Sequence, residues 1–569
     1  DANASAGIIN LVFRKEEQQG VNGRLGLMGG AGALWEKRAN LPTIRPQSRR
    51  TPKLNPSFAI NRRKGPTNAF LQGDWLHSPT LNKNEFSTRT YDDGTVIVQQ
   101  IKRNRRTDYA TLNAGVDHEF DARNTVRVAG LFNREKILDY GDNPYFDGAL
   151  QNRYRLWQFL EDEVKYTAFG TAALVHKFPQ AGHTLTFTSN YSFHREDEQY
   201  FFTNTLTSFV GKDAFKLLSD EHVVDFNADY VKPLRQGRFE GGFKGRYRSI
   251  PVNMRFFPGQ NTPIDTGAGG RATYREKIPA IYGNYVFESQ RLELEGGVRF
   301  EGVQVDYDVN PNHNTYKSDG YRYFQPFPNV RAAWKFDDAN KLSLFFNRRV
   351  DRPNEVDIRI FPKYDEPELI KVGNPALQPQ YSTSTELGYK TSWPKGSLYA
   401  AAFHRIVDGT ITRIATQAPG SVLLYNVFQN AGRSWSTGGE VVWQQSLASN
   451  LLLNANANIY RRTVDAFSVV NLYPVPVTYT APREQLTSGN VKLNATITLP
   501  SDWQLQLSNV YLAPDLLPQG RLGSRYSLDV GAKKSVQRGR GELVVNATDL
   551  LNTNQAERTI RGTNFRLVS

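Results

Sequence analysis

The feature that most constrains this chain is a repeated alternation of apolar and polar residues with a period of two. It is clearest in four stretches of the sequence, 184–193, 292–301, 451–459 and 491–499. Such alternation is typical of a β-strand that presents one apolar and one polar face. Tilted strands of about ten residues are long enough to cross a bilayer. The pattern therefore predicts an all-β chain, in which only residues 155–164 suggest a short helix within a loop.

Short turn sequences recur between pairs of these stretches. Two strands of about 12–15 residues and a tight turn fill only about half of a typical interval, so long connections must lie at the opposite end. This arrangement is typical of a transmembrane antiparallel β-barrel with short periplasmic turns and long extracellular loops. With a first strand near 21–34 and a closing last strand, the turns predict about 22 strands. The turn sequences are 64–66, 121–124, 179–182, 234–237, 288–291, 337–340, 393–396, 447–450, 500–502 and 537–540.

Composition excludes several other classes of protein. Although the chain has 569 residues, no apolar run approaches the ~18–20 residues of a membrane-spanning helix. The absence of cysteine excludes a disulfide scaffold, a thiolate zinc site and a cysteine nucleophile. The formal net charge of +14 favours acidic partners such as nucleic acid, anionic lipid or an anionic ligand. Nucleic acid is the least favoured of these, because no nucleic-acid-binding module accompanies the basic clusters.

Three segments resemble motifs of the TonB-dependent outer-membrane receptors, most closely those of the Bacteroidetes branch. Residues 6–15 resemble the last strand of a plug domain, where the chain leads into the barrel. Residues 347–354 and 373–389 resemble the Arg-Pro and Gly-Asn-Pro motifs of these receptors, with Gln380 in place of the usual Glu. Residues 425–440 resemble a third motif. The matching positions are Gly7, Asn10, Arg352, Pro353, Gly373, Asn374, Pro375, Pro379, Glu386, Gly388, Asn426, Gly439 and Glu440.

The resemblance implies a receptor and active importer in the outer membrane of a Gram-negative bacterium. Residues 1–17 would be the end of a plug domain and residues 18–569 the barrel. We therefore expect a sequence trimmed at both ends, with the last strand missing or barely begun. The partners implied are outer-membrane lipid, lipopolysaccharide and a TonB protein that pulls on the plug from the periplasm. The resemblance does not decide whether the nutrient is a siderophore–iron complex, a glycan or a peptide, or whether a surface lipoprotein lid is present. No cofactor is implied.

Two other functions stay open beside the importer, namely a passive porin and a structural or adhesive outer-membrane barrel. Simple porins have no segment that leads out of a plug, so residues 6–15 argue against the first. Alternation around a whole lipid-facing sheet argues against a water-soluble adhesion protein. The importer is therefore the favoured interpretation.

Candidate catalytic and metal-ligating residues are few. The eight His are scattered, with no HxxxH or HExxH spacing, so no metal site is expected. The acidic groups at 161–163 and at Asp365, Glu366 and Glu368 are expected on solvated loop faces rather than in a catalytic pair. Neither a nucleophile motif nor a phosphate loop occurs. The chain is therefore predicted not to be an enzyme.

Aromatic and basic side chains near the long loops are the candidate ligand contacts, since stacking and charge can capture a nutrient at the mouth. Packing of the aromatics among themselves is the alternative. The arginines either bind an anionic ligand or lipopolysaccharide phosphate, or pair with inward-facing acids such as Glu386. The candidates are Tyr140, Tyr145, Phe146, Trp157, Arg348, Arg349, Arg352 and Tyr364.

Overall fold

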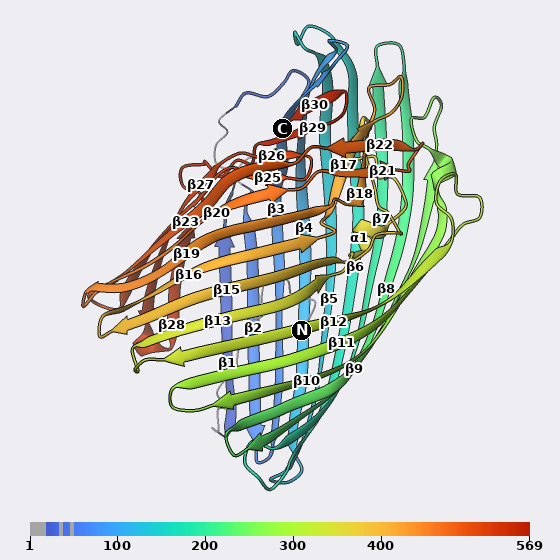
Figure 1. The fold of residues 1–569 in the computed structure, drawn as a ribbon. Coiled ribbons are helices and arrows are strands. Elements are labelled where there is room, and N and C mark those ends of the chain that lie inside the picture. The colour runs from blue at the N-terminus through green and yellow to red at the C-terminus, as the bar shows by residue number, and fades with distance from the viewer. Residues whose placement is uncertain (1–18, 33–37, 46–50) are drawn as a thin grey trace.

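The computed structural model describes residues 19–32, 38–45 and 51–569, and most of them form one wall of antiparallel strands. Neighbouring strands are joined by a short turn at one end or a long loop at the other, and the wall curves around an interior (Figure 1). In order of pairing, the strands are β1 (Gly20–Gly30), β2 (Lys53–Lys64), β3 (Thr67–Tyr91), β4 (Val96–Glu119), β5 (Asn124–Asp147), β6 (Arg153–Lys177), β7 (Thr184–Leu206), β8 (Val210–Leu234), β9 (Gly237–Phe257), β10 (Gly270–Glu288), β11 (Leu292–Val309), β12 (Asp319–Lys335), β13 (Asn340–Asp351), β15 (Gln380–Trp393), β16 (Gly396–Asp408), β19 (Arg433–Ala448), β20 (Leu451–Val464), β23 (Glu484–Leu499), β24 (Trp503–Leu512), β27 (Arg525–Val536) and β28 (Gly541–Ala547).

The short turns lie where the sequence predicts them. For example, β2 ends at Lys64 and β3 begins at Thr67, and β27 ends at Val536 before β28 begins at Gly541. The prediction of an all-β chain with antiparallel pairing is confirmed. The prediction of a helix at 155–164 is wrong, because these residues belong to β6 and alternate with period two between buried and more exposed positions. No helix among the described residues has the length and apolar character needed to cross a membrane.

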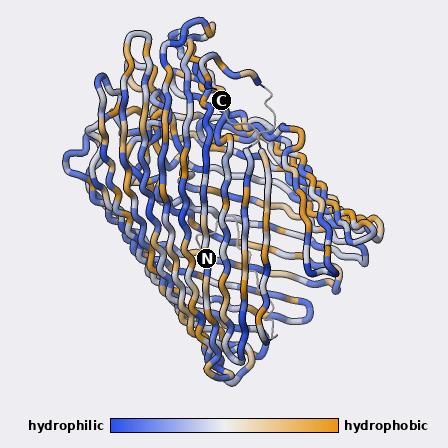
Figure 2. Tube along the Cα trace, turned by 180° about the vertical axis from the view of Figure 1, so that it is seen from behind, coloured by the Kyte–Doolittle hydropathy of each residue, from blue (hydrophilic) through white to orange (hydrophobic). Residues whose placement is uncertain are grey.

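The outward face of the wall is apolar near the short turns. Large apolar side chains stay exposed there, including Phe187, Tyr191, Phe226 and Phe243. Hydrophobic and hydrophilic residues alternate along the strands in Figure 2. An apolar band on one face and a polar opposite face are what a strand needs between lipid and an aqueous interior.

Beyond this band the long strands continue to the loop end. Strands β3 to β9 have 21–25 residues, about twice the ten needed to cross a bilayer. Their distal halves are buried on the inner face, because loop segments fold into the interior there.

These loop segments form small elements of their own. A three-stranded sheet pairs β14 in parallel with β18, which pairs in antiparallel fashion with β17. Two more hairpins, β21–β22 and β29–β30, lie at the same end of the wall (Figure 1). The bounds are η1 (Thr266–Ala268), α1 (Glu355–Ile358), β14 (Leu369–Val372), β17 (Ile411–Gln417), β18 (Leu424–Asn430), β21 (Phe467–Asn471), β22 (Val477–Ala481), β25 (Asp515–Leu517), β26 (Gly520–Leu522), η2 (Gln537–Gly539), β29 (Arg558–Arg561) and β30 (Phe565–Val568).

The two end strands of the wall are β1 and β28, and no pairing joins them within the described part of the chain. The last residues do not begin another long strand. They form β30, which pairs with β29 and with the loop end of β3 at Thr88–Tyr91.

Candidate functional site

The candidate functional site is built around residues 352–379, which connect β13 to β15 and which we call the inner segment. Its first turn is α1, capped by Asn354, whose side chain accepts a hydrogen bond from the Asp357 backbone. Its return is closed by backbone hydrogen bonds of 2.7 Å from Gly373 N to Arg359 O and from Asn374 N to Asp357 O. A Cβ on Gly373 would lie 2.4 Å from Arg359 O, so glycine is required for this close approach.

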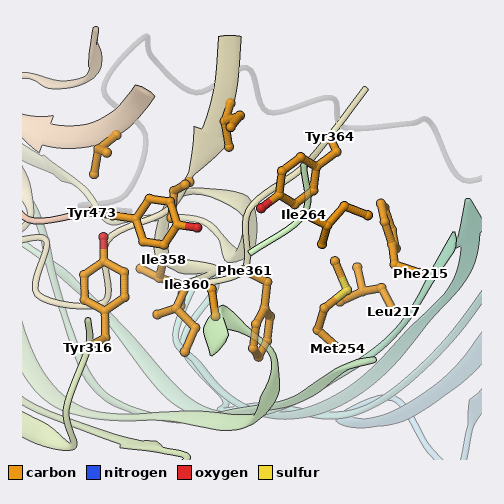
Figure 3. Close-up of a cluster of buried hydrophobic side chains, with 14 of the residues drawn as sticks. Phe215, Leu217, Met254, Ile264, Tyr316, Ile358, Ile360, Phe361, Tyr364 and Tyr473 are labelled. Atoms are coloured by element: carbon orange, nitrogen blue, oxygen red, sulfur yellow. The ribbon is translucent and has the colours of Figure 1, made fainter. Parts of the chain in front are cut away.

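One part of the inner segment is apolar and packs against the wall. Ile358, Ile360 and Phe361 belong to a cluster of buried hydrophobic side chains that also contains Met254 of β9 (Figure 3). The cluster extends to Phe215 and Leu217 on β8 and to Tyr316, Tyr364 and Tyr473 from the loops. Burial of this much apolar surface holds the segment inside the wall.

Asp265 joins several loops at the edge of this cluster. Its carboxylate accepts hydrogen bonds of 2.7 Å from the Tyr473 hydroxyl and from the Asn314 side-chain amide. Its backbone N–H donates to the Tyr364 hydroxyl at 2.7 Å. Nearby, His313 is buried, and burial lowers its pKa to about 4. These contacts tie the inner segment to three neighbouring loops.

The other part of the inner segment is ionic. Arg359 Nη2 lies 2.7 Å from Glu196 Oε2, and Lys363 Nζ lies 2.9 Å from Glu198 Oε1, both on β7. Glu368 lies 2.7 Å from Arg155 Nη1 on β6 and also pairs with Arg89 on β3. The segment is therefore bound by charge to three strands of the wall.

Within the segment, Lys371 Nζ lies 3.1 Å from Asp365 Oδ2 and 3.0 Å from Glu366 Oε1. Lys83 of β3 reaches Glu366 at 3.1 Å. Burial by itself would raise the pKa of the Asp365 carboxyl, but the Lys371 and Lys363 ammonium groups outweigh it and hold that pKa below its usual value. The carboxylates therefore stay charged and paired at neutral pH.

The expectation that these acidic groups lie on solvated loop faces is wrong for five of the six, whereas the Asp162 side chain is 41% exposed. Glu161, Glu163, Glu366 and Glu368 are each at most 3% exposed, and Asp365 is 7% exposed. They are buried because the inner segment and the distal strands enclose them between two surfaces. A buried carboxylate must be paired or hydrogen-bonded, and lysine and arginine from both surfaces meet that need.

The aromatic candidates from the sequence fall into two groups. Tyr145, Phe146, Trp157 and Tyr364 are at most 4% exposed and lie in the interior, where Trp157 Nε1 donates to Tyr364 O at 3.1 Å. Tyr140 is 39% exposed and lies in β5. The first group packs in the interior, and a role of any of the five in ligand contact stays a prediction.

The arginine candidates are also placed differently from one another. Arg352 is buried against acids of the wall, with an ion pair to Glu301 on β11 and its Nε 3.8 Å from Glu276 on β10. Arg348 lies with its guanidinium 5.0 Å from the centre of the Tyr381 ring. Arg349 lies in β13 beside them.

Glu386, the acid named from the sequence as a partner, accepts a hydrogen bond from the Tyr399 hydroxyl. Arg352 therefore pairs with an inward-facing acid, but this acid is Glu301 rather than Glu386.

The remaining motif residues lie around the inner segment. The Asn374 amide donates to Phe428 O at 3.1 Å, which ties the Gly-Asn-Pro turn to β18. A Cβ on Gly388 would meet the Tyr399 hydroxyl. Gly7 and Asn10 lie outside the described residues. The other positions are Pro353, Pro375 and Pro379 in the inner segment, Asn426 in β18, and Gly439 and Glu440 in β19.

Reasoning from the sequence missed the cations of the inner segment and the acids of β7, namely Arg359, Lys363, Glu196 and Glu198. The sequence did contain a signal that could have located Glu198, namely the turn between β6 and β7. If the turn at 179–182 joins a hairpin, positions equidistant from it face each other, so Glu163 lies opposite Glu198. No comparable signal existed for the inner segment, because it approaches these strands from a distant part of the chain.

Solved structures that share this fold include two receptors and a copper transporter. The pyoverdine outer membrane receptor FpvA from Pseudomonas aeruginosa PAO1 matches with a TM-score of 0.60 at 10% identity, over 98% of this chain and 79% of that chain. The ferric-catecholate import receptor Fiu from E. coli K12 matches with a TM-score of 0.59 at 12% identity, over 97% and 81%. The copper transporter OprC matches with a TM-score of 0.59 at 12% identity, over 98% and 80%. At such identities the likeness shows the fold.

The family assignment comes from the sequence itself. Residues 176–569 match the model of the outer membrane protein beta-barrel family. The resemblance to outer-membrane receptors is thus confirmed, whereas the Bacteroidetes branch stays a prediction. Since the match covers well over half of the 569 residues, the chain belongs to the outer membrane protein beta-barrel family and resides in the outer membrane of a Gram-negative bacterium.

Proposed function

We propose that the protein is an outer-membrane receptor that imports a scarce nutrient with energy delivered by TonB. In this proposal the wall is a closed barrel of about 22 strands, and residues 1–17 are the end of a plug. The match to the outer membrane protein beta-barrel family supports closure. The chain performs no bond chemistry, and the names of its structural relatives, which are receptors and transporters, agree with this.

The observation that carries the proposal is the position of the inner segment across the interior. It contacts β3 through Glu368, β8 through a 3.1 Å hydrogen bond between Glu355 and Ser219, and β12 through a 2.9 Å hydrogen bond from Tyr321 to Leu377 O. These strands lie on different sides of the interior (Figure 1). A passive porin needs a continuous aqueous path, whereas a gated importer needs a barrier of this kind.

The nutrient class stays part of the proposal. Siderophore–iron complexes, glycans and peptides all fit a gated importer, and the names of the structural relatives favour siderophore–iron among them. Tyr140, Arg348 and Arg349 are proposed as ligand contacts at the mouth. The buried candidates would reach a ligand only after the inner segment has moved. Arg352 and Tyr364 belong to this segment, and Tyr145, Phe146 and Trp157 are buried in the interior. A surface lipoprotein lid is an optional partner.

Uptake in cells tests the proposal. The full-length gene is expressed in a Gram-negative host with and without its tonB gene, and accumulation of labelled siderophore–iron, oligosaccharide and peptide is measured. We expect one class to accumulate only when TonB is present and the proton gradient is intact. Accumulation that survives both tonB deletion and a protonophore would indicate a porin and overturn the proposal.

Conductance in planar bilayers provides a second, independent measurement. We expect the purified protein to be nearly closed, and a variant lacking residues 355–372 to conduct. A large and steady conductance of the unmodified protein would contradict the gating role of the inner segment.

A further inference from the structure

A cluster of glutamates lies on the inner face of the β6–β7 hairpin. The register places Glu163 of β6 directly opposite Glu198 of β7, and Glu161 opposite Tyr200. Like charges directly opposite each other on a sheet destabilise it. Glu161, Glu163 and Glu198 are each at most 2% exposed, so water does not separate them. The charge of this part of the wall must therefore be compensated by a cation or removed by protonation.

Two of the nearby cations belong to the inner segment rather than to the wall. Lys363 Nζ lies 2.9 Å from Glu198 Oε1 and 3.8 Å from Glu161 Oε1, so one ammonium bridges two of the glutamates. Arg359 Nη1 lies 3.9 Å from Glu198 Oε2. The wall itself supplies Lys165 Nζ at 3.0 Å from Glu163 Oε1 and Arg105 Nη2 at 3.7 Å from Glu161 Oε2. The charge of Lys363 occupies this cluster only while the inner segment is seated.

The three carboxylates are close enough together to ligate one metal ion. One oxygen from each of Glu161, Glu163 and Glu198 lies within 4.8 Å of the other two. Two ligands of one Ca²⁺ ion, each at about 2.3–2.6 Å, are separated by up to about twice that distance. The donors are all carboxylate oxygens, which suit Ca²⁺, Mg²⁺ or Mn²⁺ rather than a softer metal.

A second observation points into the same place. Tyr200 has no exposed surface, its hydroxyl lies beside the Glu161 carboxylate, and no hydrogen bond of good geometry satisfies that hydroxyl among the described residues. The second oxygen of Glu161 is likewise buried without a hydrogen-bond partner of good geometry. Buried polar atoms of this kind are normally satisfied by protein, water or an ion. The Lys363 side chain, which a cation would have to displace, is 36% exposed.

We propose that Glu161, Glu163 and Glu198 form a binding site for a hard divalent cation, and that the Lys363 ammonium is its built-in competitor. A cation that enters displaces Lys363, and the inner segment loses one of its attachments to β7. Conversely, a seated segment excludes the cation from the site. Cation binding therefore favours release of the inner segment, and release of the segment favours cation binding by the same free energy. This inference goes beyond import and does not depend on which nutrient is carried.

The test is titration of the purified, chelator-washed protein in detergent with Tb³⁺, whose emission is excited through tyrosine, followed by displacement with Ca²⁺. Lys363→Met removes the competitor and should tighten binding at least about tenfold, because a charge-assisted hydrogen bond is lost from the competing state. The double variant Glu163→Gln/Glu198→Gln should abolish this binding step. Lys216→Met is the matched control, since Lys216 on β8 pairs with Asp197 at 3.2 Å, both side chains are at least 36% exposed, and neither forms an ion pair with the inner segment in the described part of the chain; it should leave the affinity unchanged.

Two outcomes would overturn the proposal. Binding that is equally strong in the double glutamine variant places the ion elsewhere. Equal affinities of Lys363→Met and the unmodified protein show that Lys363 does not compete with the cation. Heat-modifiable migration on gels checks that each variant is folded. In addition, Tyr200→Phe should retain the fold but weaken the emission at the site, which separates loss of the site from loss of the fold.

Discussion

Removal of Arg359 is the sharpest test of how the inner segment is held. Its side chain is 10% exposed, and Nη2 lies 2.7 Å from Glu196 Oε2 and 2.6 Å from Glu355 Oε2. Arg359→Met keeps the length of the side chain but leaves these carboxylates without their main cation. Breaking a buried ion pair from one side costs about 3–5 kcal/mol, because an uncompensated charge stays behind. We expect the substitution to destabilise the packed inner segment by this amount relative to a state in which the segment is released from the wall.

The loss of stability of the packed inner segment can be measured as an increase in the rate of cysteine labelling. Residues 1–569 contain no cysteine, so a single Val372→Cys substitution in β14, where the side chain is 2% exposed, gives one reporter in this chain. Labelling by a maleimide at pH 8 follows the fraction of molecules in which the segment is released. A loss of 3 kcal/mol corresponds to a change of more than about a hundredfold in that fraction. Arg359→Met should therefore accelerate labelling by about two orders of magnitude.

Two further variants make the interpretation specific. Adding Glu196→Gln to Arg359→Met removes one of the two unpaired buried carboxylates. The double variant should therefore be labelled more slowly than Arg359→Met alone. Arg433→Met removes an exposed pair with Asp408, in which both side chains are at least 40% exposed, and should leave labelling unchanged within about twofold. Labelling of Arg359→Met within about threefold of the parent would refute the reasoning, because the ion pairs would then contribute little to seating.

Three other predictions follow from single residues. Gly373→Ala should release the segment in the same labelling assay, because its Cβ would lie 2.4 Å from Arg359 O, whereas Gly296→Ala, with no heavy atom within 4 Å, should not. Burial lowers the pKa of His313 to about 4, so below about 6.5 the unfolded chain binds more protons and stability declines as pH falls toward 4. Thermal melts should show this decline, and His313→Asn should reduce it. Leu493→Arg on the exposed apolar face of β23 should cost about 2–4 kcal/mol near the bilayer midplane, measured by folding into vesicles, whereas the neighbouring inner-face Asn494→Arg should cost much less.

Much of the fold was predictable because its signals are local. Each strand shows its two faces within about ten residues, and most short turns are marked by their own glycine, proline or aspartate, the exceptions being 288–291 and 447–450. Asp121 illustrates the point, since its carboxylate accepts from the backbone of Arg123 and Asn124 within the same turn. The helix expected at 155–164 failed because the local pattern there was read without the strand that pairs with it.

The candidate site was much less predictable. Glu161, Glu163, Asp365 and Glu366 resemble solvated loop residues in the sequence, because charged groups are almost never fully buried unless they are paired. Their partners come from positions far away along the chain, as Lys83 does for Glu366. No local pattern reports such a pairing. The Gly-Asn-Pro motif was recognised through a resemblance, but its role in closing the inner segment became clear only from the contacts of Gly373.

The sequence by itself determined the strands, their turns, their apolar outward face and, through the family match, the outer membrane as the location. These properties follow from periodicity and turn chemistry, which act between neighbours. The tertiary structure alone decided that residues 352–379 fold inward, that the acids of β6 and β7 are buried, and that Lys363 lies among them. The physical reason is that burial and charge pairing depend on which distant segments share the interior, and such contacts exist only once the wall has curved around them.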